Sequence, residues 1–330
     1  MKAAYYDRLG PAAEVLRVGE LDTPSPGPGE VRVRVAVSGL NPSDIKGRSG
    51  FKGAMPYDRI IPHQDGAGVV DAVGEGVSRT RIGERVWVFE AQTGKAFGTA
   101  AEYVVVPTDR AIPLADEVSF EQGASLGVAA LTAHRCLFAD GALSGCRVLV
   151  HGGAGVVGYS AIQLAKWAGA WVVTTIRHEQ DRETAERSGA DLVVNLREED
   201  LPSRLMAATA NVGVDRIVDV DLRSNLELDM ACLAQGGTVS AYSVETPDAT
   251  LSIPVLKAMV KGWSFRFVLV YTMPDEAKRS AIRDITRCLA AGGYKAFVGQ
   301  VFALEDVDLA HDALEARRVK GHMLIRVGSV

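Results

Sequence analysis

A glycine-rich segment between a strand-like run and a helix-like run restricts most strongly what this 330-residue chain can fold into. Residues 153–158 read Gly-Ala-Gly-Val-Val-Gly and fit G-x-G-x-x-G, with a buried-type strand before them (147–151) and helical apolar spacing after them (159–168). In this context the glycines permit a tight turn, and the free N–H groups at the helix N-terminus face a pyrophosphate. The segment therefore predicts a dinucleotide-binding βαβ unit, and the alternative is a glycine turn that binds nothing.

The pattern of apolar residues divides the chain into three regions. Before about residue 123 it is β-rich: every second residue of 31–37 is Val, which is typical of a half-buried strand in a barrel or sandwich. From there, strands alternate with helical patterns, which indicates a doubly wound parallel sheet. After about residue 268 the pattern is less regular, and we expect the tail to return to the N-terminal domain. We therefore predict an α/β protein with a β-rich domain (1–122 and 269–330) and a doubly wound domain (123–268).

Charge and hydropathy exclude several classes of protein. The 36 Lys and Arg residues against 41 Asp and Glu give a net charge of −5, so binding to nucleic acid through bulk positive charge is not expected. No run approaches the roughly 18 apolar residues that span a bilayer, and the N-terminus has no apolar segment of signal-peptide type. We expect a soluble, cytoplasmic protein. The four cysteines are scattered without a CxxC pair, which predicts neither a disulfide framework nor a structural zinc.

The residues after the second strand of the βαβ unit favour one dinucleotide over the other. Proteins that bind NAD place an acidic residue there, against the ribose 2′-hydroxyl. Here Thr175 and Ile176 are followed by Arg177 and His178, with no acid until Glu179. A 2′-phosphate would meet Arg177 and His178, so we predict NADPH as the cofactor. The alternative is that Arg177 is solvated and Glu179 reaches back to the ribose.

Several motifs together resemble a known family. They are residues 39–44 (Gly-Leu-Asn-Pro-Ser-Asp), 65–70 (Asp-Gly-Ala-Gly-Val-Val), 98–104, 123–135 and the glycine-rich segment. In these the chain resembles the medium-chain dehydrogenase/reductase superfamily, in its zinc-free quinone oxidoreductase (ζ-crystallin-like) branch. The resemblance implies a GroES-like catalytic domain built from both ends of the chain, a Rossmann domain in the middle, and NADPH held between them. It also implies a homodimer or homotetramer, for which residues 264–271 are the candidate edge strand.

The resemblance also bears on metal binding. Zinc-dependent relatives have a Cys where this chain has Asn41, and a His where it reads His63-Gln64-Asp65. Neither Asn nor Gln is a good zinc ligand, and no Cys precedes Cys136 to build the structural zinc lobe. We therefore expect no catalytic zinc, and we expect His63 to be a structural loop residue.

The site residues are implied by the same resemblance. Asn41 would lie beside the nicotinamide and the acceptor, and Thr132 would contact the carboxamide end of the cofactor. The other implied cofactor contacts are Gly153, Gly155, Val156, Val157 and Gly158 at the pyrophosphate, Thr175, Arg177 and His178 after the second strand, Tyr242 and Ser243 past the fifth strand, Phe267 and Leu269 at the nicotinamide, and Arg317 or Lys320 at the adenosine end.

Some positions depart from the family pattern. Close quinone reductases carry tyrosines just after the Asn-Pro-x-Asp motif, where this chain has Lys46 and Lys52. Tyr57 is then the candidate proton donor, and the two lysines are candidates for favouring an anionic acceptor. For Phe267 and Leu269 the alternative is packing in the core or in a dimer.

The predicted function is zinc-independent transfer of hydride from NADPH to a quinone. The alternative enzyme is an NADPH-dependent enone or 2-alkenal double-bond reductase, and both require a small electrophilic acceptor as the substrate. A different class of function is an NADPH-binding structural or RNA-binding protein of the ζ-crystallin kind, which the acidic balance of charge disfavours.

Overall fold

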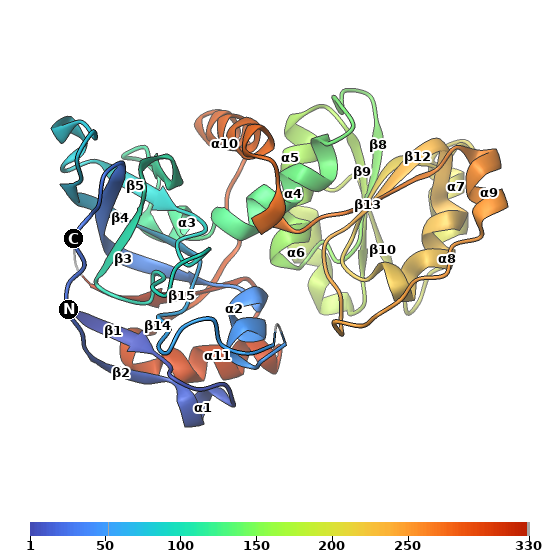
Figure 1. Cartoon of the computed structure of the whole chain (residues 1–330). Coiled ribbons are helices and arrows are strands. Elements are labelled where there is room, and N and C mark those ends of the chain that lie inside the picture. The colour runs from blue at the N-terminus through green and yellow to red at the C-terminus, as the bar shows by residue number, and fades with distance from the viewer. Residues whose placement is uncertain (52, 329–330) are drawn as a thin grey trace. The chain divides into compact units, whose positions relative to one another are not determined.

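A computed structural model describes residues 1–51 and 53–328 of the chain, so Lys52 lies outside the described residues. The chain divides into two compact units, the first made of Met1–Val128 with Ala296–Val330 and the second of Ala129–Lys295 (Figure 1). In the described ranges no helix is long and apolar enough to cross a membrane.

Unit 1 is built around the long strand β3 (Glu30–Leu40). Its alternating valines Val31, Val33 and Val35 are at most 1% exposed and form an apolar core with other strands of the unit. The strands of the main sheet follow the order β14-β15-β3-β4-β5-β7, and β6 also pairs with β3. Their bounds are β4 Asp65–Val73, β5 Arg85–Val88, β6 Tyr103–Pro107, β7 Ala111–Pro113, β14 Val298–Ala303 and β15 His322–Arg326.

The C-terminal tail completes the sheet of unit 1. Strand β15 pairs antiparallel with β3, with Leu324 opposite Gly39, and β14 pairs parallel with β15. The tail therefore returns to the N-terminal region, as the less regular sequence pattern after residue 268 predicts. The remaining elements of unit 1 are β1 Lys2–Tyr5, α1 Ala12–Val15, β2 Arg17–Glu20, α2 Pro42–Arg48, η1 Arg79–Arg81, η2 Thr108–Arg110, α3 Phe120–Gly123, η5 Leu304–Asp306 and α11 Val307–Glu315.

Unit 2 is a six-stranded parallel sheet in the order β10-β9-β8-β11-β12-β13. This is the strand order of the dinucleotide-binding Rossmann fold, in which the first strand lies at the centre. The strands are β8 Arg147–Val150, β9 Trp171–Ile176, β10 Leu192–Asn195, β11 Val214–Asp219, β12 Leu233–Ala241 and β13 Ser264–Phe267.

Helices cover both faces of this sheet, which buries the apolar strands on both sides. Figure 1 shows α5 and α6 on one side of the sheet and α7, α8 and α9 on the other. The helices are α4 Gly127–Phe138, α5 Val156–Trp167, α6 Arg182–Arg187, α7 Leu201–Ala208, α8 Leu222–Cys232, α9 Val255–Lys261 and α10 Asp275–Ala290, with short η3 Glu179–Asp181 and η4 Val270–Thr272.

The unit boundaries differ from the predicted 123–268. Residues 269–295 belong to unit 2 because helix α10 is tied to it: Asp284 of α10 pairs with His134 Nε2 at 2.9 Å. The Tyr294 hydroxyl, just after α10, bonds Ser160 Oγ at 2.8 Å. Residues 123–128 belong to unit 1, where the Val128 N–H donates to Asp65 Oδ2 at 2.8 Å. The loss of regular βαβ rhythm near residue 268 therefore marks the end of the sheet and not the end of the unit.

Candidate functional site

The glycine-rich segment forms the turn from β8 into α5. Gly152 has a φ of +70°, and Gly155 is the N-cap residue of α5. A Cβ atom at Gly153 would lie 2.2 Å from Thr174 Oγ1, and one at Gly158 would lie 2.3 Å from the Gly152 carbonyl oxygen. Any side chain at these two positions would collide with neighbouring atoms, so the turn requires glycine for its close packing.

The start of α5 is suited to an anion. The first N–H groups of the helix, those of Val156, Val157 and Gly158, have no acceptor within the helix. The first turn carries no acidic side chain, so no carboxylate competes for these donors. The helix dipole adds a partial positive charge at the same end. These features match what a diphosphate group needs.

Thr175 supports this turn from the neighbouring strand β9. Its Oγ1 atom accepts a hydrogen bond from the Gly152 N–H at 3.1 Å, and its carbonyl oxygen accepts one from the Gly153 N–H at 3.1 Å. Thr175 is 2% exposed. Its side chain is therefore occupied in holding the turn, although the sequence predicts it as a cofactor contact.

A pocket of about 290 Å³ lies where β9 and β10 end. It brings together the two predicted phosphate ligands, Arg177 and His178. The sequence prediction missed Arg197, although its position two residues after the third strand of the doubly wound domain is a readable signal. The lining residues are Arg177, His178, Glu179, Gln180, Asn195, Arg197 and Glu198.

Charges in this pocket favour a phosphate over a ribose hydroxyl. Both carboxylate oxygens of Glu179 are occupied, one by Arg182 and the other by Arg182 and the Asn195 amide. These two partners, Arg182 first, lower the pKa of Glu179. In the described part of the chain, Arg177 and Arg197 have no carboxylate within ion-pair distance, so two guanidinium groups are available to an anion. This arrangement disfavours the alternative in which Glu179 binds the ribose.

The other residues predicted in unit 2 are spread over three elements. Thr132 lies on α4 and is 5% exposed, while Tyr242 and Ser243 follow directly after β12. Phe267 and Leu269, at the end of β13 and just beyond it, are 69% and 55% exposed. Such exposure excludes the core-packing alternative for these two side chains within unit 2.

In unit 1, Asn41 is held at the N-terminus of α2. Pro42 opens the helix, and the backbone N–H of Asn41 donates to Asp44 Oδ2 at 2.7 Å. The Asn41 side-chain amide donates to Asp65 Oδ2 at 2.9 Å, and Asn41 is only 3% exposed. Asp44 thus braces the backbone of Asn41, while Asp65 fixes the plane of its amide.

Asp65 is the most unusual ionisable group in this region. It is fully buried, and burial raises its pKa to about 7, although the hydrogen bonds from Val128 N–H and Asn41 oppose this rise. Its Oδ1 atom has no hydrogen-bond partner among the described residues. A Cβ atom at Gly127 would lie 2.0 Å from that oxygen, so glycine is required there. Near neutral pH the carboxyl group therefore holds a proton more readily than an ordinary Asp.

The neighbouring loop does not offer a zinc site. Both ring nitrogens of His63 are engaged, Nδ1 with Ser38 Oγ at 2.8 Å and Nε2 with His311 Nε2 at 3.0 Å. The Gln64 amide oxygen accepts from the Gln92 N–H at 3.2 Å. Asn41 stands where zinc-dependent relatives have a Cys. The groups available here are therefore the amides of Asn41 and Gln64 and the carboxyl group of Asp65, and this donor set does not fit zinc.

Three predicted residues of unit 1 lie in loops. Tyr57 lies in the loop between α2 and β4, is 36% exposed, and makes no hydrogen bond to Asn41 or Asp65. Arg317, with a φ of +51°, and Lys320 lie in the loop between α11 and β15. Their roles at the acceptor and at the cofactor stay predictions.

Comparisons with known proteins agree with this architecture. Residues 27–116 match the family model described as alcohol dehydrogenase GroES-like domain, and residues 156–287 match the one described as zinc-binding dehydrogenase. The quinone oxidoreductase of Sus scrofa is 30% identical over 315 residues, which cover 94% of each chain. That of Rattus norvegicus is 30% identical over 318 residues, again 94% of each chain.

Solved structures give the same result. The Escherichia coli quinone oxidoreductase complexed with NADPH superposes with a TM-score of 0.83 at 27% identity, covering 99% of this chain and 100% of the other. The Thermus thermophilus quinone oxidoreductase, solved alone and with NADPH, has a TM-score of 0.82 at 27% identity with the same coverage. The chain belongs to the medium-chain dehydrogenase/reductase superfamily, in its quinone oxidoreductase branch.

Proposed function

We propose that this protein is an NADPH-dependent oxidoreductase that reduces a quinone without zinc. The observation that carries the cofactor assignment is the pocket at the ends of β9 and β10, where Arg177 and Arg197 are free of carboxylates and Glu179 is occupied by Arg182. The acceptor assignment rests on the quinone oxidoreductases among the relatives.

The residues of unit 2 hold the cofactor in this proposal. The N–H groups of Val156, Val157 and Gly158 bind the diphosphate, and Arg177, with Arg197, binds the 2′-phosphate. Thr175 acts through the turn by fixing the Gly152 N–H. When bound, NADPH supplies a hydride from its nicotinamide ring.

The residues of unit 1 orient the acceptor. One amide hydrogen of Asn41 is committed to Asp65, and the side-chain oxygen faces the Asp44 N–H in a capping box, so the remaining amide hydrogen can donate to the acceptor in a defined direction. A quinone gains one hydride and one proton to become a hydroquinone. Asp65 is a positioning residue here because it is fully buried and acts through Asn41. The proton comes from Tyr57 or from solvent.

Steady-state assays with two acceptors test this proposal. NADPH oxidation is followed with 1,4-benzoquinone and, in parallel, with an α,β-unsaturated ketone. Turnover with the quinone supports the proposed function, while turnover with the ketone alone assigns the double-bond reductase instead. If neither acceptor is reduced, both enzyme proposals fail, and a salt-dependent RNA titration with NADPH as competitor tests the remaining class.

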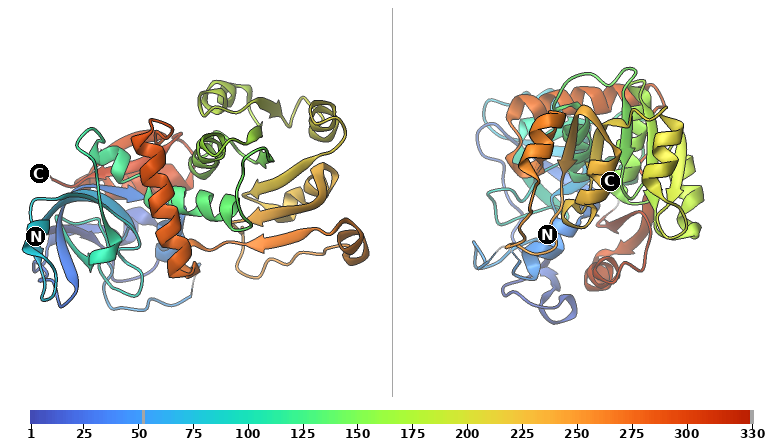
Figure 2. Two further views of the ribbon diagram at one scale, coloured as in Figure 1. Left: turned by 90° about the horizontal axis from the view of Figure 1, so that it is seen from above. Right: turned by 90° about the vertical axis from the view of Figure 1, so that its right-hand side faces the viewer.

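We also propose a homodimer formed through the β13 edge of unit 2. Strand β13 pairs with β12 alone in the described sheet, and Figure 2 shows the orange strand at the sheet's edge. The preceding helix α9 exposes four apolar side chains that are 66–74% exposed, a surface that monomers rarely leave uncovered. They are Val255, Leu256, Met259 and Val260.

Sedimentation equilibrium tests the dimer. The parent protein is expected to sediment at twice the mass of one chain, and the double variant Leu256→Glu, Met259→Glu at the mass of one chain. A matched pair of glutamates on the exposed polar face of α10, Arg279→Glu and Arg283→Glu, is expected to stay dimeric. A monomeric parent protein would exclude this proposal.

A further inference from the structure

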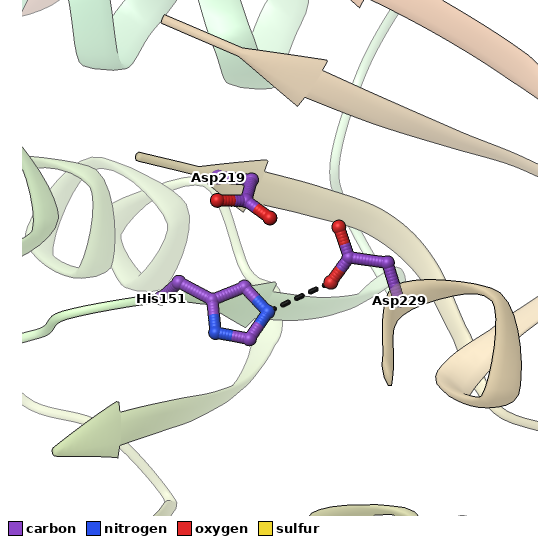
Figure 3. A group of neighbouring side chains, drawn as sticks. All are labelled: His151, Asp219 and Asp229. Atoms are coloured by element: carbon purple, nitrogen blue, oxygen red, sulfur yellow. Dashed lines mark hydrogen bonds and ion pairs between the residues drawn. The ribbon is translucent and has the colours of Figure 1, made fainter. Parts of the chain in front are cut away.

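Three ionisable side chains meet in the interior of unit 2 (Figure 3). His151 follows β8, Asp219 ends β11, and Asp229 lies on α8. All three are at most 2% exposed, and one ligand-type atom of each lies within 4.8 Å of the others. Figure 3 shows the His151 ring pointing to the Asp229 carboxylate, at 2.8 Å from Nε2 to Oδ1. The proposed function assigns no role to this cluster.

A chain of hydrogen bonds joins the cluster to the turn. The Gly152 N–H donates to Thr175 Oγ1 at 3.1 Å, and Thr175 Oγ1 lies 3.1 Å from His151 Nδ1. With the imidazole hydrogen on Nε2, facing Asp229, the Nδ1 lone pair accepts the Thr175 hydroxyl hydrogen. Every donor in the chain then has an acceptor. Asp229 thereby fixes the tautomer of His151, His151 fixes the Thr175 hydroxyl, and Thr175 fixes the first N–H of the turn.

The two carboxyl groups of the cluster cannot both be ionised without strong repulsion. Asp219 Oδ1 accepts from the Asn225 amide at 3.1 Å, but Oδ2 of Asp219 and Oδ2 of Asp229 have no partner among the described residues. Burial and, to a smaller extent, the nearby Asp219 together raise the pKa of Asp229 to about 7, although the hydrogen bond and charge of His151 oppose the rise. The raised pKa therefore favours a proton on Asp229 near neutral pH.

We propose that His151, Asp219 and Asp229 position the glycine-rich turn, and that the protonation of this cluster sets the affinity of the turn for the cofactor diphosphate. This inference rests on the proposed binding of NADPH. When a proton leaves, the cluster becomes more negative by one charge in a dry interior near a site that binds an anion. Affinity for NADPH then falls as the pH rises through neutrality.

The charged and titratable groups that face the cluster do not produce the same effect. Burial opposes a charge on His151, but the hydrogen bond to Asp229 and the nearby charges of Asp229 and Asp219 raise the pKa of this histidine, against a smaller effect of the Arg177 guanidinium. Cys232 at the end of α8 has its pKa raised to about 12, mainly by burial, and burial also raises the pKa of Tyr242 after β12. Both therefore stay neutral between pH 6 and pH 9, so His151 and Asp229 are the groups of the cluster that titrate, and a proton lost from either one makes the cluster more negative.

The test measures the dissociation constant of NADPH by its fluorescence between pH 6.5 and pH 9. The parent protein is expected to bind on the order of tenfold more weakly at the upper end, since one buried charge is added near the diphosphate. Asp229→Asn still accepts the His151 hydrogen bond but cannot ionise, so its profile should be flat at the high affinity of the parent at pH 6.5. Asp229→Leu breaks the chain and should bind on the order of tenfold more weakly at every pH.

Asp284→Asn is the matched control, because it neutralises another Asp that pairs with a His in unit 2 and should keep the profile of the parent. A profile for Asp229→Asn that is parallel to the parent's would overturn the inference. Stoichiometric zinc or manganese in the purified parent protein, lost in Asp229→Asn, would also overturn it, since a cation would then replace the proton.

A second measurement needs no cofactor. Hydrogen exchange of peptides that cover residues 151–160 should be at least about fivefold faster in Asp229→Leu than in the parent and unchanged in Asp229→Asn. Equal protection in all three proteins would overturn the positioning role even if NADPH did not bind. If protection changes as expected but the parent binds no NADPH, the proposed function fails and the positioning of the turn stands.

Discussion

The buried histidines of unit 1 predict a defined loss of stability in acid. His63 is fully buried, its Nδ1 bonds Ser38 Oγ, and its Nε2 bonds His311 Nε2. Arg48 Nε donates to His311 Nδ1 at 3.3 Å, so the His311 hydrogen must lie on Nε2 and be donated to His63. The pair is therefore complete only when both rings are neutral, and protonation of either one places a positive charge in the core.

The size of the effect follows from the shift in pKa. Burial lowers the pKa of His63 to about 3 from the ordinary 6.5. The neutral ring is thus favoured in the folded chain, so stability is complete above pH 6.5 and is lost as the pH falls toward 3. Between pH 7 and pH 5, His63 binds a proton in the unfolded chain but not in the folded chain. This lowers the free energy of unfolding by about 2 kcal/mol from His63 alone. The pKa of His311 is lowered in the same direction.

The assay compares the parent with His63→Asn, because Asn tolerates the local φ of +80° and does not titrate. Urea unfolding is followed by circular dichroism at pH 7 and pH 5. Buried Asp65 acts in the opposite direction, since its raised pKa favours the folded chain as the pH falls, so the parent's own change can be small. From pH 7 to pH 5, the free energy of unfolding of the variant should therefore rise by about 2 kcal/mol relative to that of the parent. The same pH dependence in both proteins would refute the reasoning.

Three further predictions concern the two sites. Arg177→Ala should raise the dissociation constant of NADPH by about tenfold or more and that of NADH little, because it removes the proposed 2′-phosphate ligand. Arg187→Ala, on exposed α6, is the control, and equal effects on both cofactors would reject the role. Gly158→Ala should lower the melting temperature by several degrees and weaken NADPH binding, because its Cβ would lie 2.3 Å from the Gly152 carbonyl oxygen; wild-type values would contradict the requirement for glycine. Between pH 6 and pH 8, Asp65→Asn should lose about 1 kcal/mol less stability than the parent, since the raised pKa of Asp65 makes the parent's folded chain most stable below that range. Urea unfolding at both pH values measures the loss, and the same loss in both proteins would assign it to other groups.

Features that depend only on neighbouring residues could be predicted from the amino-acid sequence. The glycine-rich turn needs only the strand before it and the helix after it, so its pattern predicts both its position and its anion-binding N–H groups. The alternating valines of β3 predict a half-buried strand because successive side chains of a strand point to opposite faces. The position of Arg177 at the pocket after β9 was also predictable, since it stands at a fixed place in a local βαβ unit.

Tertiary structure decided everything that depends on partners far apart in the sequence. Asn41 and Asp65 are 24 positions apart, and His151 and Asp229 are 78 apart, yet each pair makes a buried hydrogen bond. Whether such a group is a charged ligand, a neutral brace or a proton-sharing carboxyl group depends on its burial and on its hydrogen-bond partners, and the local sequence contains neither. For the same reason helix α10 belongs to unit 2: the contact between His134 and Asp284 assigns it there, and no sequence pattern near residue 268 does.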